Sequence, residues 1–190
     1  MGINKNAVIV LHEIYGINSF IKDICENLKT LRFDVFCPDM LEGKRFPYSK
    51  AEEAHSCFYS NIKPDYYKEV EALISMLKST YDKVFVLGFS AGAAIAWRCC
   101  EYPDCDGIIC CYGSRIRDYL MLKPVMPVLL LFAEKDFFDV KLVAKELVKK
   151  QNVELYILPA DHGFMDPYSA SFDAQQNKIA EMHIRRFLGM

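Results

Sequence analysis

KVFVLGFSAGAAIAWRCC, residues 83–100, is the stretch that decides the fold. Its first part, Lys83–Gly88, is a short apolar run rich in β-branched and aromatic residues, which predicts a buried strand. Its second part, Ala91–Cys100, is an apolar stretch with helical character. GFSAG, residues 88–92, joins the two. A G-x-S-x-G pattern between a strand and a helix is typical of a nucleophile elbow.

The tightness of such an elbow explains why it needs serine between glycines. Side chains on the flanking positions would collide, so Gly88 and Gly92 keep the space free while Ser90 is pushed outward with strained backbone angles. The backbone N–H of Ala91 then faces any oxyanion formed on attack, and the dipole of the following helix favours that negative charge. A serine in a glycine-rich turn without function is the alternative, which the strand before it and the helix after it disfavour.

Five further apolar runs lie on either side of this stretch, and amphipathic patterns separate them. Alternation of strands and helices forces parallel pairing through right-handed crossovers. The sequence therefore predicts an α/β fold: a reduced, doubly wound, mainly parallel sheet of about six strands with helices on both faces. The other predicted strands are Ala7–Leu11, Asp34–Cys37, Gly107–Tyr112, Val128–Ala133 and Val153–Leu158, and the other helices cover Ile17–Leu31, Val70–Leu77, Val140–Val148 and Ile179–Leu188.

Three stretches richer in Pro, Gly, Ser or charge interrupt this rhythm: residues 39–64, 113–127 and 161–171. The first is long and includes a predicted short helix, Ala51–Tyr59. Long excursions on compact α/β domains often shape binding sites, so we expect residues 39–64 to form a partial cap. The length of 190 residues and the absence of a linker favour a single domain over 1–190.

Composition narrows the classes of partner. A formal net charge of −2, spread along the chain, offers no basic patch for nucleic acid or anionic lipid, which leaves a small-molecule substrate. Met1–Asn6 has no basic region before a long apolar run, and Ala7–Leu11 is too short for a signal peptide or membrane span, so we expect a cytoplasmic protein. The eight cysteines lack zinc spacing and fall in apolar runs, which indicates core packing. We expect no metal, no cofactor, and a monomer or weak homo-oligomer.

A serine nucleophile needs a histidine that a carboxylate orients. His162 follows the last predicted strand, at the carboxyl edge where open α/β sheets bind ligands. Asp136 follows the strand Val128–Ala133 and completes the order Ser, Asp, His. His12 is the rival base, whereas His55 and His183 fall on the cap and the last helix and are interpreted as surface residues. Glu134, Asp139 and Asp161 are the rival carboxylates.

Three groups of motifs together resemble the dienelactone hydrolase family of the α/β-hydrolase superfamily. They are HEIYGIN at residues 12–18, CPD at residues 37–39, and the three segments around Ser90, Asp136 and His162. The resemblance spans nearly the whole chain. It implies an eight-stranded sheet or a reduced version of it. It also implies that Ile14 supplies a second oxyanion N–H beside Ala91, and that Glu13 lies near the nucleophile and tunes it.

The chain departs from the family pattern in two ways. Members known for dienelactone cleavage use cysteine where Ser90 stands. They also hold a substrate carboxylate with arginines, one just after the catalytic histidine, whereas Gly163-Phe164-Met165-Asp166 offers no cation here. We therefore expect anionic substrates to be disfavoured unless an arginine from elsewhere reaches the pocket. Arg45, Arg115 and Arg117 are candidates, and solvated surface charge is their favoured interpretation.

These patterns predict a serine hydrolase that cleaves a carboxylic ester, lactone or thioester of a small molecule through an acyl-enzyme. The alternative is a non-catalytic, small-molecule-binding protein of the same fold. Aromatic side chains at the predicted strand ends and in the cap suggest an apolar pocket rim, with core packing as the equal alternative for several. They are Tyr15, Phe46, Tyr48, Tyr112, Phe138 and Phe164. The expected substrate contacts or tuning residues are Glu13, Tyr15, Tyr112 and Phe164.

Overall fold

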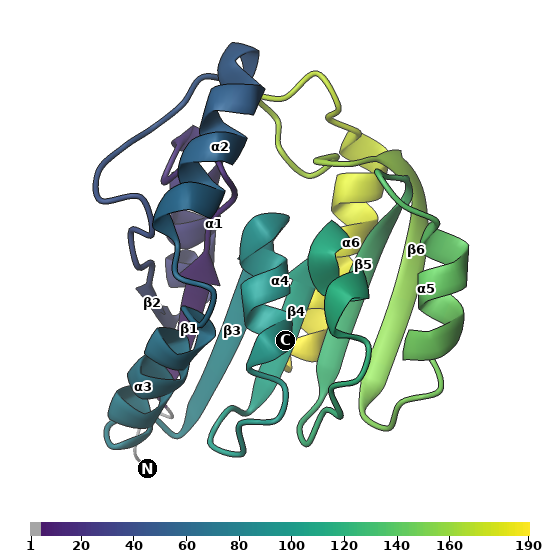
Figure 1. Cartoon of the computed structure of the whole chain (residues 1–190). Helices are drawn as coiled ribbons and strands as arrows, with labels where there is room; N and C mark the ends of the chain where they lie inside the picture. The colour runs from purple at the N-terminus through teal and green to yellow at the C-terminus, as the bar shows by residue number, and fades with distance from the viewer. Residues whose placement is uncertain (1–4) are drawn as a thin grey trace.

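Each of the six runs predicted to be strands forms a strand of one parallel sheet. The structure is a computed structural model that describes residues 5–190, and within them the strand order is β2-β1-β3-β4-β5-β6 (Figure 1). Neighbouring strands are parallel throughout. The predicted fold class is thus confirmed. The strands are β1 (Asn6–Leu11), β2 (Phe33–Phe36), β3 (Lys83–Phe89), β4 (Gly107–Cys111), β5 (Val128–Lys135) and β6 (Val153–Asp161).

The connections contain the predicted helices. The α-helices are α1 (Ser19–Thr30), α2 (Ala51–Asn61), α3 (Tyr67–Lys78), α4 (Ala91–Arg98), α5 (Val140–Leu147) and α6 (Ala174–Phe187). Two short 3₁₀ helices, η1 (Tyr48–Lys50) and η2 (Ser114–Tyr119), lie in the irregular stretches after β2 and β4. Side chains mark several helix starts: the N-cap Asn18 accepts a hydrogen bond from the N–H of Ile21, and Asp139 accepts one from Leu142.

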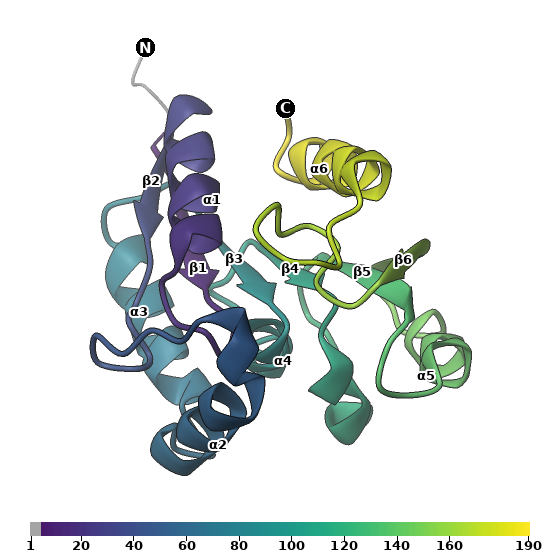
Figure 2. The ribbon, with the colours of Figure 1, turned by 90° about the horizontal axis from the view of Figure 1, so that it is seen from above.

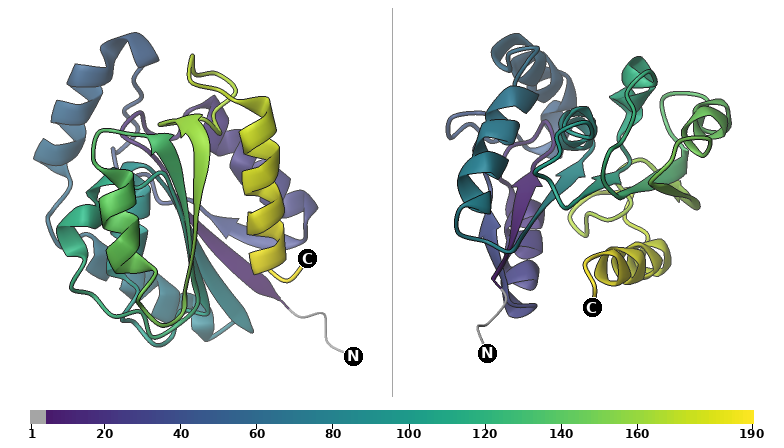
Figure 3. Two further views of the ribbon diagram at one scale, coloured as in Figure 1. Left: turned by 90° about the vertical axis from the view of Figure 1, so that its right-hand side faces the viewer. Right: turned by 90° about the horizontal axis from the view of Figure 1, so that it is seen from below.

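The helices cover the two faces of the sheet unequally. Figure 2 shows α1 and α6 on one face, and α3, α4 and α5 on the other. Figure 3 shows α5 and α6 on opposite sides of β5 and β6. Two buried clusters fill the spaces between layers. Phe20 and Ile184 belong to the cluster under α1 and α6, whereas Ile74, Trp97 and Leu147 belong to the cluster under α3, α4 and α5.

α4 is the most deeply buried helix. Every residue from Ala91 to Trp97 is buried, which explains why its sequence is apolar on all sides instead of amphipathic. Its N-terminus follows β3 directly. β1 lies between β2 and β3, so the order of the strands reverses there and creates the switch point at which such sheets bind ligands.

Two strands extend by two or more residues beyond their predicted ends. β5 continues to Lys135 and β6 to Asp161, and these two residues pair with each other after a register shift between Ala133 and Lys135. Apolar patterning could not show this extension, because the added stretches contain charged residues and a proline, and Lys135 and Asp161 pair through their backbones. The extension carries the chain to the residues that follow, Asp136 and His162.

Other expectations from the sequence have mixed outcomes. Residues 1–4, part of the N-terminal stretch used for the cytoplasmic prediction, lie outside the described residues. No helix within residues 5–190 has the length and apolar character needed to cross a bilayer. All eight cysteines are free. Six of them are buried, in agreement with core packing, and Cys37 and Cys57 are half-buried.

Candidate active site

Ser90 occupies a strained turn between β3 and α4. Its backbone has φ 50° and ψ −111°, outside the region that residues other than glycine ordinarily adopt. The flanking glycines are required by space: a Cβ on Gly88 would lie 2.4 Å from the carbonyl oxygen of Gly92, and one on Gly92 would lie 2.2 Å from that of Leu11. The N–H of Ser90 donates to the carbonyl of Cys111, 2.9 Å away, and thereby ties the turn to β4.

The structure brings the three predicted side chains together at the carboxyl edge of the sheet. The Ser90 Oγ lies 2.9 Å from His162 Nε2, and His162 Nδ1 lies 2.9 Å from Asp136 Oδ2. Both contacts are satisfied by one tautomer, in which Nδ1–H donates to Asp136 and Nε2 accepts from the Ser90 hydroxyl. The Asp136 side chain is fully buried, whereas His162 keeps 20% of its side-chain surface exposed. This arrangement has the geometry of an activated serine.

The rival carboxylates are engaged elsewhere. Glu134 pairs with Lys141 at 3.0 Å, and Asp161 lies 3.7 Å from Lys135. Asp139 caps α5. Of the four weighed from the sequence, Asp136 is the one that contacts His162.

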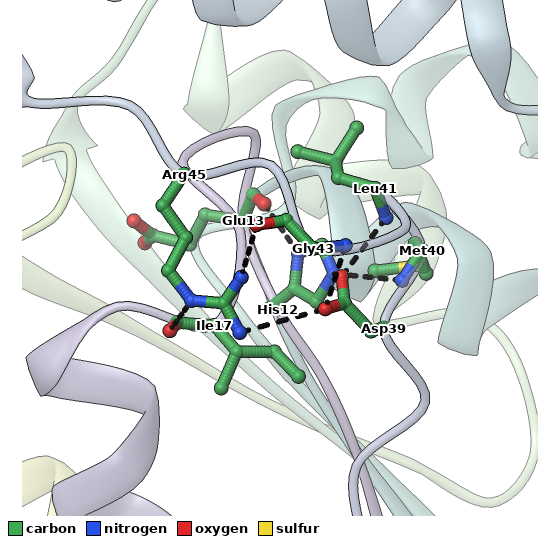
Figure 4. A network of polar contacts seen from close by, with 8 residues as sticks. All are labelled: His12, Glu13, Ile17, Asp39, Met40, Leu41, Gly43 and Arg45. Atoms are coloured by element: carbon green, nitrogen blue, oxygen red, sulfur yellow. Dashed lines mark hydrogen bonds and ion pairs between the residues drawn. The ribbon is translucent and has the colours of Figure 1, made fainter.

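His12, the rival histidine, is a buried structural residue. Its Nδ1–H donates to the carbonyl of Glu13 at 2.6 Å, and its Nε2 accepts from the N–H of Met40 at 3.0 Å. Burial lowers the pKa of His12, in keeping with a neutral ring held between two backbone groups. Figure 4 shows this ring beside Asp39, which also accepts from the N–H groups of Leu41 and Gly43.

From the sequence we expect two backbone amides to bind an oxyanion, those of Ile14 and Ala91. Within residues 5–190 the N–H groups of Ile14 and Ala91 donate to no protein acceptor. Ala91 is the first residue of α4, whose opening N–H groups have no partner inside the helix. Ile14 follows β1, in a turn that Gly16 completes with φ 79°.

Ser90 and His162 open into a pocket of about 750 Å³, which we call the large pocket. Its volume lies within the range of about 300–1,000 Å³ typical of small-molecule sites. Its walls come from the loop after β1, from η1 and α2, from η2, and from the loops after β5 and β6. Besides Ser90 and His162 they include Glu13, Ile14, Tyr15, Tyr48, Ala51, Glu52, His55, Tyr59, Ser114, Arg115, Arg117, Phe137, Gly163, Asp166, Ser169, Ala170 and Ser171.

Comparison with known proteins places this architecture in one family. The model of the dienelactone hydrolase family matches residues 2–189. The chain belongs to the dienelactone hydrolase family. It is also 40% identical over 174 residues to the protein YczH of Bacillus subtilis (strain 168), with 89% of this chain and 85% of YczH covered.

Two further comparisons extend this result. Carboxymethylenebutenolidase 1 of Cupriavidus pinatubonensis is 23% identical over 199 residues, which cover 96% of this chain and 85% of the relative. The crystal structure of the "Putative Dienelactone Hydrolase" from Klebsiella pneumoniae superposes with a TM-score of 0.84 at 19% identity, covering 97% of this chain and 86% of that one. The family and the fold together support an ester or lactone hydrolase.

Glu13, which the dienelactone hydrolase resemblance placed near the nucleophile, is buried in the wall of the large pocket with 5% of its surface exposed. Burial is the largest influence on its carboxyl group and raises the pKa to about 7, while a charge on His162 would lower it. Asp166, also nearly fully buried, raises the pKa of Glu13 further. A proton on Glu13 is therefore gained or lost near neutral pH, beside the histidine.

The predicted aromatic residues divide between pocket and core. Tyr15 and Tyr48 line the large pocket, with ring centroids 4.8 Å apart. Tyr112 and Phe164 are fully buried and do not line it, so neither is placed for direct substrate contact. Tyr112 instead packs edge-on against His162, with a centroid separation of 5.1 Å, and against Phe164. Phe46 and Phe138 pack on the core cluster under α3, α4 and α5.

Two of the three arginines reach the pocket, contrary to their favoured interpretation as surface charge. Arg115 and Arg117 both line it. Arg45 does not: its Nε donates to the carbonyl of Ile17 at 2.6 Å and its Nη1 to Gly43 at 2.7 Å, which holds the loop after β2 against the loop after β1 (Figure 4). The wall of the large pocket thus carries both signs of charge.

We did not predict from the sequence that one face of α2 lines the large pocket. His55 is exposed, as expected, but lines the large pocket together with Glu52 and Tyr59. These three residues stand at positions i, i+3 and i+7 of a helix and so share one face. Polar and aromatic residues at that spacing were the available signal. The serines after His162, at 169 and 171, carried no such pattern.

Proposed function

We propose that this chain is a serine hydrolase that cleaves a carboxylic ester, lactone or thioester of a small molecule through an acyl-enzyme. The observation that carries the proposal is the unbroken line of contacts from Ser90 through His162 to Asp136, with both distances at 2.9 Å. The Ser90 end of this line faces the large pocket, where a carbonyl group can bind.

The reaction would proceed in two halves. His162 Nε2 takes the Ser90 proton as Oγ attacks the carbonyl carbon, and the N–H groups of Ile14 and Ala91 bind the oxyanion. His162 then gives the proton to the leaving oxygen or sulfur, which departs and leaves an acyl group on Ser90. Water, deprotonated by the same imidazole, releases the acid and restores Ser90. Asp136 keeps the imidazole oriented and stabilises its charged form.

Substitution of the nucleophile tests this proposal. We expect Ser90→Ala to lower the kcat for p-nitrophenyl acetate by several orders of magnitude, because alanine has no hydroxyl with which to form the acyl-enzyme. Ser114→Ala is the matched control, since Ser114 also lines the large pocket but has no contact with His162. Equal rates for wild type and Ser90→Ala would contradict the assignment.

Covalent labelling separates this function from that of a binding protein. A fluorophosphonate reacts with an activated serine, so we expect one adduct on the Ser90 peptide in the wild type and none in Ser90→Ala. Mass spectrometry of the digested protein locates the adduct. A wild-type protein that stays unlabelled while keeping its fold would favour a non-catalytic binding protein.

A further inference from the structure

A second, smaller pocket lies behind Ser90. It measures about 220 Å³ and we call it the small pocket. Ala91, the residue after the serine, is part of its wall, and Ala94 and Ile95 continue that wall along α4. Phe58 of α2 and Ile62 of the loop that follows it form the opposite side. Its volume falls below the usual range of about 300–1,000 Å³ for a complete small-molecule site, which fits a subsite of a neighbouring one.

Two side chains belong to the walls of both pockets. Tyr59 and Arg115 line both pockets, and the guanidinium carbon of Arg115 lies 4.9 Å from the centroid of the Tyr59 ring. The Nε of Arg115 donates to Asp118 at 3.0 Å. This pair, which we call the partition, therefore lies on the border between the two pockets.

The cations at the small pocket already have protein partners. Arg98 donates to the carbonyl of Pro64, and its guanidinium carbon lies 4.1 Å from the ring centroid of Tyr67 and 4.7 Å from that of Tyr119. Lys63 lies 3.5 Å from Glu69. With Arg115 bonded to Asp118, the wall left for a ligand is largely the apolar surface of α2 and α4.

The position of His162 decides which part of a substrate can enter the small pocket. The leaving group must lie near His162 to receive its proton, and His162, Phe137 and Gly163 line only the large pocket. An acyl chain bound to Ser90 extends away from the leaving group. We propose that the small pocket binds the unbranched apolar acyl chain of the substrate, and that Tyr59 and Arg115 set the length and width it accepts. This inference rests on the function proposed above.

A series of p-nitrophenyl esters from acetate to dodecanoate tests the inference through ratios of kcat/KM. Each buried CH₂ group is worth about fourfold in binding, so we expect the hexanoate-to-acetate ratio to reach the order of 10²-fold before longer chains bring no further gain. Ala94→Phe fills the small pocket and should lower that ratio at least tenfold. An Ala94→Phe protein that folds and keeps the wild-type ratio would overturn the proposal.

Two further variants complete the design. Ala170→Phe narrows the large pocket instead, and should leave the hexanoate-to-acetate ratio within about twofold of wild type. Tyr59→Ala removes an exposed side chain from the partition, so it tests the idea even if Ala94→Phe fails to fold. We expect Tyr59→Ala to move the best chain length upward by two or more carbons, and an unchanged profile would count against the partition.

A binding measurement keeps this inference distinct from the catalytic proposal. In Ser90→Ala, the affinities for 2-octanone and 2-butanone can be compared by competition with a pocket-binding fluorophore. We expect 2-octanone to bind at least tenfold more tightly, and Ala94→Phe to remove that preference. If Ser90→Ala keeps this preference but still cleaves the esters at the wild-type rate, the proposed function alone is overturned, whereas equal affinities in the Ser90→Ala protein would overturn the acyl subsite.

Discussion

Single side chains decide the chemistry of this site, and Asp136 is the sharpest case. Its carboxylate is fully buried and lies 2.9 Å from His162 Nδ1. We expect Asp136→Asn to reduce kcat by about 10⁴-fold, because an amide favours the wrong imidazole tautomer and does not stabilise its charge. Steady-state kinetics and a melting temperature for each variant check this. Glu134→Gln is the control, since Glu134 pairs with Lys141 instead, and a comparable loss there would reassign the orienting residue.

Glu13 makes stability depend on pH. Burial raises its pKa from 4.5 to about 7, so the folded chain holds this proton over a range in which the unfolded chain has released it. The proton-bound form stabilises the fold fully below about pH 4.5, and that stabilisation is lost as the pH rises through about 7. The difference amounts to about 3 kcal/mol.

The variant Glu13→Gln isolates this effect because glutamine does not titrate. We expect the free energy of unfolding of Glu13→Gln, relative to wild type, to increase by about 3 kcal/mol between pH 4.5 and pH 8.5. Urea unfolding at a series of pH values measures it. Glu52→Gln makes the same change at an exposed position of the pocket wall. Parallel stability curves for wild type and Glu13→Gln would show that the Glu13 carboxyl titrates as it does in water.

For single residues, the sequence predicted where in the fold a side chain lies better than it predicted what that side chain contacts. Ser90, Asp136 and His162 could be found because each follows an apolar run and sheet topology brings strand ends together. The burial of Tyr112 and Phe164 could not be predicted, because a residue at a strand end can turn into the pocket or back into the core. The direction of the Arg115 side chain could not be predicted either, because it depends on η2, which has no apolar periodicity.

Among the elements, η1 and the loop after β6 are tied together across the large pocket. The Tyr48 hydroxyl donates to the carboxylate of Asp166 and accepts from Asn18 at 3.0 Å. Asp166 is 1% exposed, and its other oxygen accepts from the N–H of Tyr168 at 2.8 Å. This single bridge fixes the loop after the histidine against segment 39–64, which supports the proposal that the segment acts as a partial cap.

Removal of that bridge should cost stability. Tyr48→Phe leaves a buried carboxylate without one of its donors, and we expect the free energy of unfolding to fall by about 1–3 kcal/mol. Tyr168→Phe is the matched control, since its hydroxyl bonds Asp23 at an exposed position and its loss should cost less than about 1 kcal/mol. Denaturant midpoints compare the two variants. Equal effects would mean that the bridge contributes no more than a surface contact.

The periodicity of apolar residues predicted which segments form helices and strands. It did not predict how segment 39–64 packs on the rest of the fold. α1 was predictable because its apolar residues repeat at helical spacing, and its N-cap Asn18 marks its start. In α2 only Ala54 and Phe58 are buried, so the sequence indicated a helix but not which face meets the pocket. That orientation depends on tertiary contacts such as that of Tyr59 with Arg115 of η2, which no local pattern encodes.

For the whole molecule, the two core clusters share one sheet and should unfold together. Phe20 lies on the α1 side with 1% exposure, and Trp97, the sole tryptophan, lies fully buried on the other side. We expect Phe20→Ala to lower the free energy of unfolding by about 3–5 kcal/mol. The transition seen by Trp97 fluorescence should shift as far as the one seen by far-ultraviolet circular dichroism. Transitions that separate would contradict the prediction of a single domain.

Segment 39–64 departs from β2 and rejoins the fold through α3 without adding a strand, yet Tyr48, Ala51, Glu52, His55 and Tyr59 from it face the large pocket. Ser90, His162 and Asp136 stand on other connections. The proposed catalytic side chains and this part of the pocket wall thus lie on separate pieces of chain. Because this segment pairs with no strand of the sheet, substitutions in it can reshape the pocket wall without altering the strained turn at Ser90.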